Sequence, residues 1–261
     1  MNQKNYFKKL NMKTYALIQA RMSSTRLPGK VLKKINGKTL IEIMLNRLKN
    51  SQKIDKIIVA TSTNKENDIL SKIVIDLGYS CFRGSENDVL DRFYNAVKND
   101  HCDYIVRLTA DCPLIDPILV DKVIEMTIKS NVDYGSNSLK EEFPDGQDTE
   151  VFTYESLKKT WINAKLSSER EHVTPYLRKN THFFGKKIFS SKHFNAEKDL
   201  GYLRMTVDES EDFDAIETLI NNLGENCGWL DYANFILNNQ TKFKNQKIIR
   251  NEGYAKSLKN D

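Results

Sequence analysis

Residues 15–30 read YALIQARMSSTRLPGK, an apolar run followed by a cationic loop. The first six residues, 15–20, form a short apolar run of the kind that makes a buried β-strand. The ten residues from 21 to 30 hold three cations, three hydroxyls and a Pro-Gly turn. In open α/β sheets, ligands bind beyond the carboxyl ends of the strands. A cationic loop at that position therefore predicts a site for an anionic ligand.

The segments that follow alternate between strand and helix patterns. Residues 56–61, 80–82 and 104–109 are expected strands, and residues 39–50, 64–77 and 117–128 are expected helices. Asn64 is expected to cap the second helix and Gly78 to end it, while Asp116 and Pro117 open the third. Such alternation predicts an α/β fold of three layers, with a mostly parallel sheet between helices.

The pattern changes after Val132. Residues 134–195 give a loop at 144–146, a strand near 150–153 and helices near 155–164 and 168–179, so we expect a small α+β insertion or lid. A strand at 202–207 and helices at 209–223 and 229–239 follow. The main domain should therefore span residues 14–239, with a flexible N-terminal tail at 1–13 and a basic, solvated C-terminal tail at 240–261.

Composition and charge exclude several classes of protein. Of the 261 residues, 39% are hydrophobic and 29% are charged, as in ordinary globular proteins. No apolar run reaches the roughly 18 residues of a membrane span, and residues 1–13 lack the apolar region of a secretory signal. Four cysteines without C-x-x-C spacing favour reduced thiols, and hence a cytoplasmic protein.

The net charge of +5 comes from the ends of the chain. Residues 1–13 and residues 240–261 each carry +4, which leaves −3 for residues 14–239. Nucleic-acid-binding proteins usually carry a basic face on their folded body. We therefore expect no nucleic-acid partner.

The cations of the first loop suit a polyphosphate. Arg21 and Arg26 can grip phosphate oxygens with two N–H groups each, and Lys30 can act as a point charge. Two common phosphate motifs are absent: a P-loop would need glycine at Ser24 and a hydroxyl residue at Val31, and there is no Gly-x-Gly-x-x-Gly. The loop is therefore a candidate polyphosphate site of another kind.

At this point a family resemblance becomes plain. Residues 20–30 resemble the signature loop of CMP-sugar synthetases, notably the 3-deoxy-manno-octulosonate cytidylyltransferases, and are still more similar to the spore coat polysaccharide biosynthesis cytidylyltransferases. Four further blocks, residues 83–92, 107–113, 170–174 and 203–208, match the second family in order. Together the five blocks cover most of residues 14–255, which makes the resemblance specific.

The resemblance implies a fold and a reaction. The expected fold is the Rossmann-like fold of nucleotide-diphospho-sugar transferases. The expected enzyme is a nucleotidyltransferase that transfers CMP from CTP to a sugar acid or a related sugar or polyol, with release of pyrophosphate, for surface polysaccharide or glycan biosynthesis. In CMP-sugar synthetases the insertion forms a dimer interface, so the resemblance also implies a homodimer.

Two carboxylates follow expected strands. Asp111 and Asp208 should reach the edge of the sheet that carries the loop, and Mg²⁺ usually binds one or two carboxylates plus substrate phosphates. The resemblance implies the same metal role for both. Alternatively, Asp111 shapes the turn before Pro113, and Asp208 caps a helix with Glu211 as its capping-box partner.

The expected mechanism relies on positioning and charge rather than on covalent catalysis. The acceptor oxygen attacks the α-phosphate of CTP in line, and pyrophosphate leaves. Arg21, Arg26 and Lys30 would neutralise the charge that grows on the leaving group. Mg²⁺ on Asp111 and Asp208 would bridge the α-phosphate and help to deprotonate the acceptor.

Other candidates rest mainly on the resemblance. Arg83 matches a position near the cytosine ring, and Gln147, Asp148 and Glu150 fall where related enzymes bind the acceptor. The remaining candidate nucleotide- or acceptor-binding residues are Gln19, Ala20, Ser23, Ser24, Arg170 and His172.

Two other functions stay open. A metal-dependent glycosyltransferase on a similar fold would need a D-x-D motif at a strand end. Asp212 and Asp214 form a D-x-D, but they fall on different faces of an expected helix, so we discount them. A non-catalytic nucleotide-binding protein is expected to lack an essential cation or carboxylate, whereas Lys30, Asp111 and Asp208 are all present.

Overall fold

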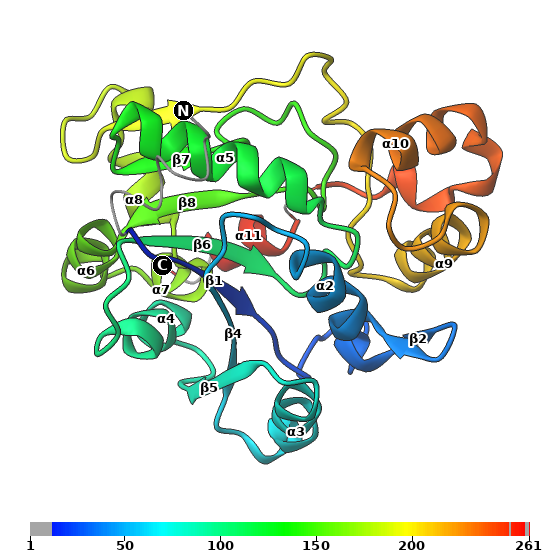
Figure 1. Ribbon diagram of the computed structural model, residues 1–261, viewed down its shortest axis with the longest axis horizontal. Helices are drawn as coiled ribbons and strands as arrows, with labels where there is room; N and C mark the ends of the chain where they lie inside the picture. The colour runs from blue at the N-terminus through cyan, green and yellow to red at the C-terminus, as the bar shows by residue number, and fades with distance from the viewer. Residues whose placement is uncertain (1–11, 251, 259–260) are drawn as a thin grey trace.

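Seven strands form one central sheet in the computed structural model, which describes residues 12–250, 252–258 and 261 (Figure 1). The order is β5-β4-β1-β6-β8-β7-β9. All neighbouring pairs are parallel except those of β8, which runs antiparallel to β6 and β7. The strands are β1 (Thr14–Gln19), β4 (Lys56–Ser62), β5 (Ser80–Gly84), β6 (Tyr104–Thr109), β7 (Tyr134–Ser136), β8 (Glu150–Thr153) and β9 (Ser191–His193). The predicted mostly parallel α/β fold is confirmed.

Helices cover both faces of this sheet, as Figure 1 shows. They are α2 (Leu40–Leu48), α3 (Asp68–Asp76), α4 (Val89–Val97), α5 (Pro117–Ser130), α6 (Tyr154–Asn163), α7 (Ser167–His172), α8 (Pro175–Lys179), α9 (Ser210–Leu223), α10 (Trp229–Asn238) and α11 (Glu252–Ser257). A two-stranded hairpin, β2 (Lys34–Ile35) and β3 (Lys38–Thr39), precedes α2. Asp116 accepts hydrogen bonds from the first backbone N–H groups of α5, so its predicted capping role is confirmed.

Strand β1 shows why the core has two sides. Ala16 and Ile18 are fully buried in one hydrophobic cluster with residues of α2, α3 and α5, while Leu17 is fully buried in another with residues of α4, α6 and α8. Successive side chains of a strand point to opposite faces, so one apolar strand serves both clusters. A fully buried aliphatic side chain contributes about 1.5–3 kcal/mol, which stabilises β1 as an interior strand between β4 and β6.

The segment 134–195 does not stand apart from the sheet. Its three short strands, β7, β8 and β9, form one end of the central sheet, with β8 paired directly to β6. Residues 134–195 therefore extend the central sheet, and their role as an insertion or lid stays a prediction. Strands of three or four residues are too short to show a periodic sequence pattern, which is why the pattern seemed to break there.

Three local predictions are also corrected. Residues 202–207 form no strand, and one isolated bridge joins Arg204 to Asp145. The expected helix 168–179 is divided at Val173, whose φ of 70° is outside the helical range. Asp208 does not cap α9, because Glu209 is the N-cap and Asp212, rather than Glu211, is its capping-box partner.

The C-terminal segment packs on the body instead of extending into solvent as a tail. Phe243 is 3% exposed and Asn245 is fully buried. Asn245 donates from its side-chain nitrogen to Asp212 in α9 at 3.1 Å. Buried apolar and hydrogen-bonded groups of this kind stabilise the segment despite its basic composition. The expected tail at 1–13 lies mostly outside the described residues.

Two further observations concern helix length and the cysteines. Within residues 12–250, 252–258 and 261, no helix is long and apolar enough to cross a membrane. All four cysteines are free, as their spacing predicts.

Candidate active site

The cationic loop is anchored before it reaches the site. It leaves β1 at Gln19, and the Met22 backbone N–H donates to the side-chain oxygen of Asn67 at 2.9 Å. Asn67 is fully buried and is held by Thr61 and Ser62 at the end of β4. The loop closes where Gly29, with a φ of 66°, donates its N–H to the Met22 carbonyl at 3.0 Å. Asn67, rather than the predicted Asn64, is the N-cap residue of α3, while Asn64 precedes the 3-10 turn Lys65–Asn67 that leads into this helix.

Lys30 lies at the centre of the site. Its Nζ is 3.2 Å from Asp111 Oδ2 and 2.8 Å from Asp208 Oδ1, and it donates to the Val207 carbonyl at 2.7 Å. The residue is only 9% exposed. Burial alone would lower the pKa of Lys30, but the two carboxylates outweigh it and raise that pKa. Lys30 is therefore a fixed positive charge in the wall of the site.

Backbone contacts bring the two aspartates together. The Asp111 carbonyl accepts hydrogen bonds from the Val207 N–H at 2.7 Å and from the Thr206 hydroxyl at 3.1 Å. The chain around residue 207 is thus tied to the turn after β6 without forming a strand. Burial alone would raise the pKa of Asp111, but Lys30 outweighs it and holds that pKa below its usual value. Asp111 is therefore ionised at neutral pH.

The two arginines of the loop are also paired with carboxylates. Arg26 lies 3.0 Å from Asp208 and 3.2 Å from Glu209. Arg21 lies 3.4 Å from Glu86, which also accepts a hydrogen bond from the Ser23 hydroxyl at 2.5 Å. Glu86 lies in the matched block 83–92, but no local sequence pattern predicts this pairing.

A cavity of about 470 Å³ collects most of the predicted residues. The predicted residues that line it are Gln19, Ala20, Arg21, Ser24, Arg26, Lys30, Asp111, His172 and Asp208. They come from the loop after β1, the turn after β6, the segment before α9 and the end of α7. We call this space the loop cavity.

Six predicted residues lie outside the loop cavity: Asp148 and Glu150 line the spaces beside it, and the other four line none of these spaces. Ser23 faces Glu86, and Arg83 donates to the Ser62 and Asn64 carbonyls and lies 2.7 Å from Asp68. Their contacts therefore assign them to holding the loop and the end of β4.

Gln147 and Arg170 also lie outside the loop cavity, and their side chains contact helices and turns of the fold. Gln147 is fully buried; its side-chain nitrogen donates to the Leu114 carbonyl, and its side-chain oxygen accepts from the Asp116 N–H. Arg170 is 2.6 Å from Asp88, the N-cap of α4, and donates to the Trp161 carbonyl. Both side chains connect elements of the fold.

Two further spaces adjoin the loop cavity. A junction cavity of about 230 Å³ shares Asp111 and Asp208 with it, and a second cavity of about 450 Å³ shares Asp148 and Glu150 with the junction. His172 and Arg107 line all three spaces. The three cavities therefore lie next to one another.

Arg107 is a site residue that the sequence reasoning did not single out. It lies on β6, donates to Glu150 at 2.6 Å and reaches the Gln19 side chain at 3.4 Å. The available signal was an arginine within the apolar strand pattern YIVRLT, because a charge on a buried strand needs a partner or a ligand.

His172 stands beside an unusual turn. The next residue, Val173, has φ 70° and ψ −56°, and the Thr174 N–H donates to the His172 carbonyl at 2.8 Å. This is a classic γ-turn, a rare and strained form that clusters at functional sites when a bulky residue adopts it. The imidazole is 3.0 Å from the Ser257 hydroxyl, and burial followed by the charge of Arg107 lowers the pKa of His172.

The carboxylates fit a magnesium ion that is completed by substrate. Within the described residues, no cluster of three or more His, Cys, Asp or Glu side chains could hold a metal. Asp111 and Asp208 nevertheless both lie within hydrogen-bonding distance of one nitrogen of Lys30. Mg²⁺ characteristically takes one or two carboxylates and fills its other positions with water and phosphate. The donor set therefore suits Mg²⁺ together with a nucleotide.

Comparison with known proteins defines the class. The sequence profile of the family described as Cytidylyltransferase matches residues 15–250. The chain therefore belongs to the cytidylyltransferase family, and it is a nucleotidyltransferase of the CTP-dependent class.

Individual relatives make the match more specific. The chain is 46% identical to "Uncharacterized protein MJ1063" of Methanocaldococcus jannaschii over 202 residues, 77% of this chain and 81% of the relative. It is 34% identical to the spore coat polysaccharide biosynthesis protein SpsF of Bacillus subtilis over 215 residues, 80% and 87% of the two chains. A solved cytidylyltransferase from Leptospira borgpetersenii superposes with a TM-score of 0.84 at 34% identity, covering 92% of this chain and all of the other. The resemblance to the spore coat proteins is thus confirmed.

Proposed function

We propose that the protein transfers CMP from CTP to a sugar acid, or to a related sugar or polyol, and releases pyrophosphate in surface polysaccharide or glycan biosynthesis. The observation that carries the proposal is the convergence of Arg21, Arg26 and Lys30 with Asp111 and Asp208 around one cavity. Cations from one loop and carboxylates from two others are what a nucleoside triphosphate with a divalent cation requires.

The loop cavity would hold the triphosphate. Lys30 is charged and fixed, and Arg21 and Arg26 are the other cations of the loop that line this cavity. As the bond from the α-phosphorus to the bridging oxygen breaks, its electron pair passes to pyrophosphate, and the three cations offset the growing charge. In the protein without nucleotide, Arg21 is paired with Glu86 and Arg26 with Glu209. On nucleotide binding, both arginines would leave these carboxylates and contact the phosphates.

Asp111 and Asp208 would hold magnesium, which would neutralise phosphate charge and favour loss of the acceptor proton. The chain itself contributes the position of these two carboxylates, because Lys30 and the Asp111–Val207 backbone contact hold them together.

The second cavity would hold the acceptor. It shares Asp148 and Glu150 with the junction cavity, which in turn shares Arg26, Asp111 and Asp208 with the loop cavity. In-line displacement requires the acceptor hydroxyl to reach the α-phosphate opposite the pyrophosphate, and we expect it to approach through the junction cavity. Asp148 and Glu150 line this cavity, in agreement with the expected acceptor region. A cytoplasmic homodimer remains part of the proposal.

The direct test is pyrophosphate release from CTP with Mg²⁺ and a panel of sugar acids, sugars and polyols. We expect release with at least one acceptor and loss of at least 10²-fold in rate for Asp111→Asn and Asp208→Asn. A matched control is Asp121→Asn, because Asp121 lies on α5 and bonds Ser51 and Gln52 away from the cavities. Near-normal turnover by both site variants would refute the proposal.

The D-x-D motif of Asp212 and Asp214 does not support the glycosyltransferase alternative. Asp212 is fully buried and is bonded to Arg204 and to two backbone N–H groups, whereas Asp214 is exposed on the same helix. The D-x-D pair therefore does not converge on one metal, and the nucleotidyl-transfer proposal keeps the support of the site.

A further inference from the structure

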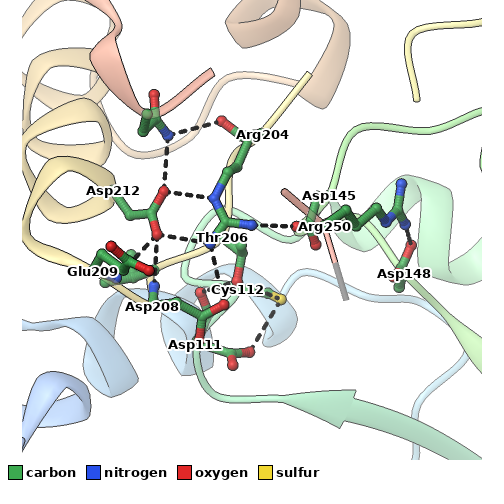
Figure 2. A network of polar contacts seen from close by, with 12 residues as sticks. Asp111, Cys112, Asp145, Asp148, Arg204, Thr206, Asp208, Glu209, Asp212 and Arg250 are labelled. Atoms are coloured by element: carbon green, nitrogen blue, oxygen red, sulfur yellow. Dashed lines mark hydrogen bonds and ion pairs between the residues drawn. The ribbon is translucent and has the colours of Figure 1, made fainter. Parts of the chain in front are cut away.

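Arg204 is a buried charge at the back of the site. It is 4% exposed, although arginine is rarely buried without several partners. Three aspartates surround its guanidinium: Asp145, Asp208 and Asp212, in the network that Figure 2 shows. Arg204 lines none of the three cavities, so it is not placed to touch a ligand.

One of these contacts reaches the predicted metal carboxylate. Arg204 Nη2 is 3.2 Å from Asp208 Oδ2, while the other oxygen of Asp208 is 2.8 Å from Lys30 Nζ. Arg26 also lies 3.0 Å from Asp208 Oδ2, on the side of the loop. Asp208 is therefore held from both sides. Substrate phosphates would draw away Arg26, and Arg204 would remain as the contact behind the carboxylate.

Asp212 fixes Arg204 and Asp208 relative to one another. It accepts from Arg204 Nε at 2.7 Å and Nη2 at 2.8 Å, a two-point contact that leaves the guanidinium no freedom to rotate. The same carboxylate accepts the backbone N–H groups of Asp208 at 2.9 Å and Glu209 at 3.0 Å at the start of α9. One buried residue thus positions the arginine and the backbone of its target.

The remaining contact of Arg204 points toward the acceptor side. Its Nη1 is 2.7 Å from Asp145 Oδ2, and Asp145 lines the junction cavity together with Asp111 and Asp208. Backbone hydrogen bonds also join the segments around Asp145 and Arg204, since the Met205 N–H donates to the Asp145 carbonyl at 2.6 Å. They restrain the loop that carries Asp145. Arg204 therefore connects the carboxylates of the nucleotide side and the acceptor side.

We propose that Arg204 is a positioning residue that, with Asp212, orients the Asp208 carboxylate for divalent-cation binding and sets its distance from the acceptor side through Asp145. The inference rests on the proposed function for the identity of the nucleotide. It goes beyond that function because it assigns metal affinity to a residue that touches neither metal nor substrate. Groups behind a metal ligand commonly change metal affinity by about 10–100-fold.

The test compares two buried arginines. Arg204→Gln removes the charge, Arg204→Lys keeps it without the two-point geometry, and Arg47→Lys is the control. Arg47 is 2% exposed and donates to the carbonyls of Ile115, Glu225 and Cys227, away from the cavities. All three variants should lower the melting temperature, so stability alone does not distinguish them.

Metal affinity provides the distinguishing measurement. Free Mn²⁺ is followed by electron paramagnetic resonance with each protein, first alone and then with CTP. We expect Arg204→Gln to weaken Mn²⁺ binding about 10–100-fold, Arg204→Lys to weaken it less, and Arg47→Lys to leave it at the wild-type value. Asp212→Asn serves as a second variant should Arg204→Gln not fold, and we expect it to weaken binding in the same direction.

Each outcome separates the two proposals. Unchanged Mn²⁺ affinity in the folded Arg204 variants, or an equal loss in Arg47→Lys, overturns the positioning role. Mn²⁺ binding that depends on Arg204 but is indifferent to CTP supports the positioning role and counts against the cytidine assignment. Wild-type protein that binds no Mn²⁺ with or without CTP refutes both.

Discussion

At the scale of single residues, Lys30 and the carboxylates around it determine the charge of the candidate site. A buried lysine keeps its charge here only because Asp111 and Asp208 compensate for the loss of water. The three groups are therefore energetically coupled: removing the cation leaves two carboxylates facing one another, and removing a carboxylate leaves part of a buried charge unpaired.

Replacing Lys30 by Met should reduce the rate of CMP transfer by about 10²–10³-fold, because a fixed cation beside the leaving group is lost. The measurement is pyrophosphate release at saturating CTP. Lys53→Met is a matched control, since Lys53 is also largely shielded but pairs with Glu125 on α5. A Lys30→Met enzyme with wild-type turnover would contradict the role of this cation.

Asp145 predicts how stability varies with pH. Burial, followed by the neighbouring Asp148, raises the pKa of Asp145 to about 7, although Arg250 and Arg204 oppose the shift. Because this folded-state pKa exceeds the ordinary value of 3.8, the native state retains a proton that the unfolded chain loses. The stabilising contribution of the protonated group is thus complete below about pH 4 and is lost as the pH rises through 7.

We therefore expect the melting temperature of wild type minus that of Asp145→Asn to fall between pH 4 and pH 8. Thermal unfolding of both proteins in matched buffers measures this difference. Parallel curves across that range would mean that the carboxyl of Asp145 has an ordinary pKa in the folded protein.

How far the sequence predicts the site also depends on individual residues. Lys30, Asp111 and Asp208 were predicted because each lies at a fixed place after an apolar run or in a matched block. Arg170 also lies in a matched block, and Gln147 was chosen from the expected acceptor region, yet both side chains contact residues that are distant in sequence, such as Asp88 and Asp116. Asn67 and Arg204 were missed for the same reason: their roles arise from contacts that no local pattern encodes.

At the scale of elements, the loop after β1 functions only if it is held in place. Met22 is bonded to Asn67, and Gly29 provides the positive φ that closes the loop. The long buried strands were predicted well, since β6 has the expected bounds of 104–109. The short strands β7 and β9 were not, because the partners that stabilise them come from elsewhere in the chain.

Asn67→Ala should release the loop. Removing a buried side chain that pairs with Met22, Thr61 and Ser62 costs about 1–3 kcal/mol, and the mobile loop should bind CTP more weakly. Asp116→Ala is the control, because losing the cap of α5 costs a similar amount, about 0.5–2 kcal/mol, without touching the loop. Equal CTP affinity in both variants, measured by calorimetry, would contradict this role.

At the scale of the whole molecule, the C-terminal segment completes the series of cavities. Tyr254 lines the second and junction cavities, and Ser257 lines the loop cavity. Asp261 accepts hydrogen bonds from the Ser168 backbone and hydroxyl at the start of α7. A segment that composition alone assigns to solvent is thus part of the site wall, and the family match, which ends at residue 250, stops short of it.

Deleting residues 251–261 should loosen α7 and His172 while leaving the loop cavity able to bind CTP. Hydrogen exchange should become faster in residues 167–172, since the contacts from Ser257 and Asp261 are removed. Exchange in β1 and β6 serves as the internal reference. Unchanged exchange in α7 would mean that the C-terminal segment does not restrain the wall.

We expect this fold to present its cationic loop and two aspartates to CTP with Mg²⁺. Thermal unfolding with CTP, UTP, GTP or ATP, each with Mg²⁺ or with EDTA, tests it without knowledge of the acceptor. A ligand at a hundredfold excess over its dissociation constant stabilises the native state by about 2.7 kcal/mol. We predict a clear rise in melting temperature with CTP and Mg²⁺ that EDTA reduces, and smaller rises with the other nucleotides. No rise with CTP, or an equal rise with all four nucleotides, would contradict the account.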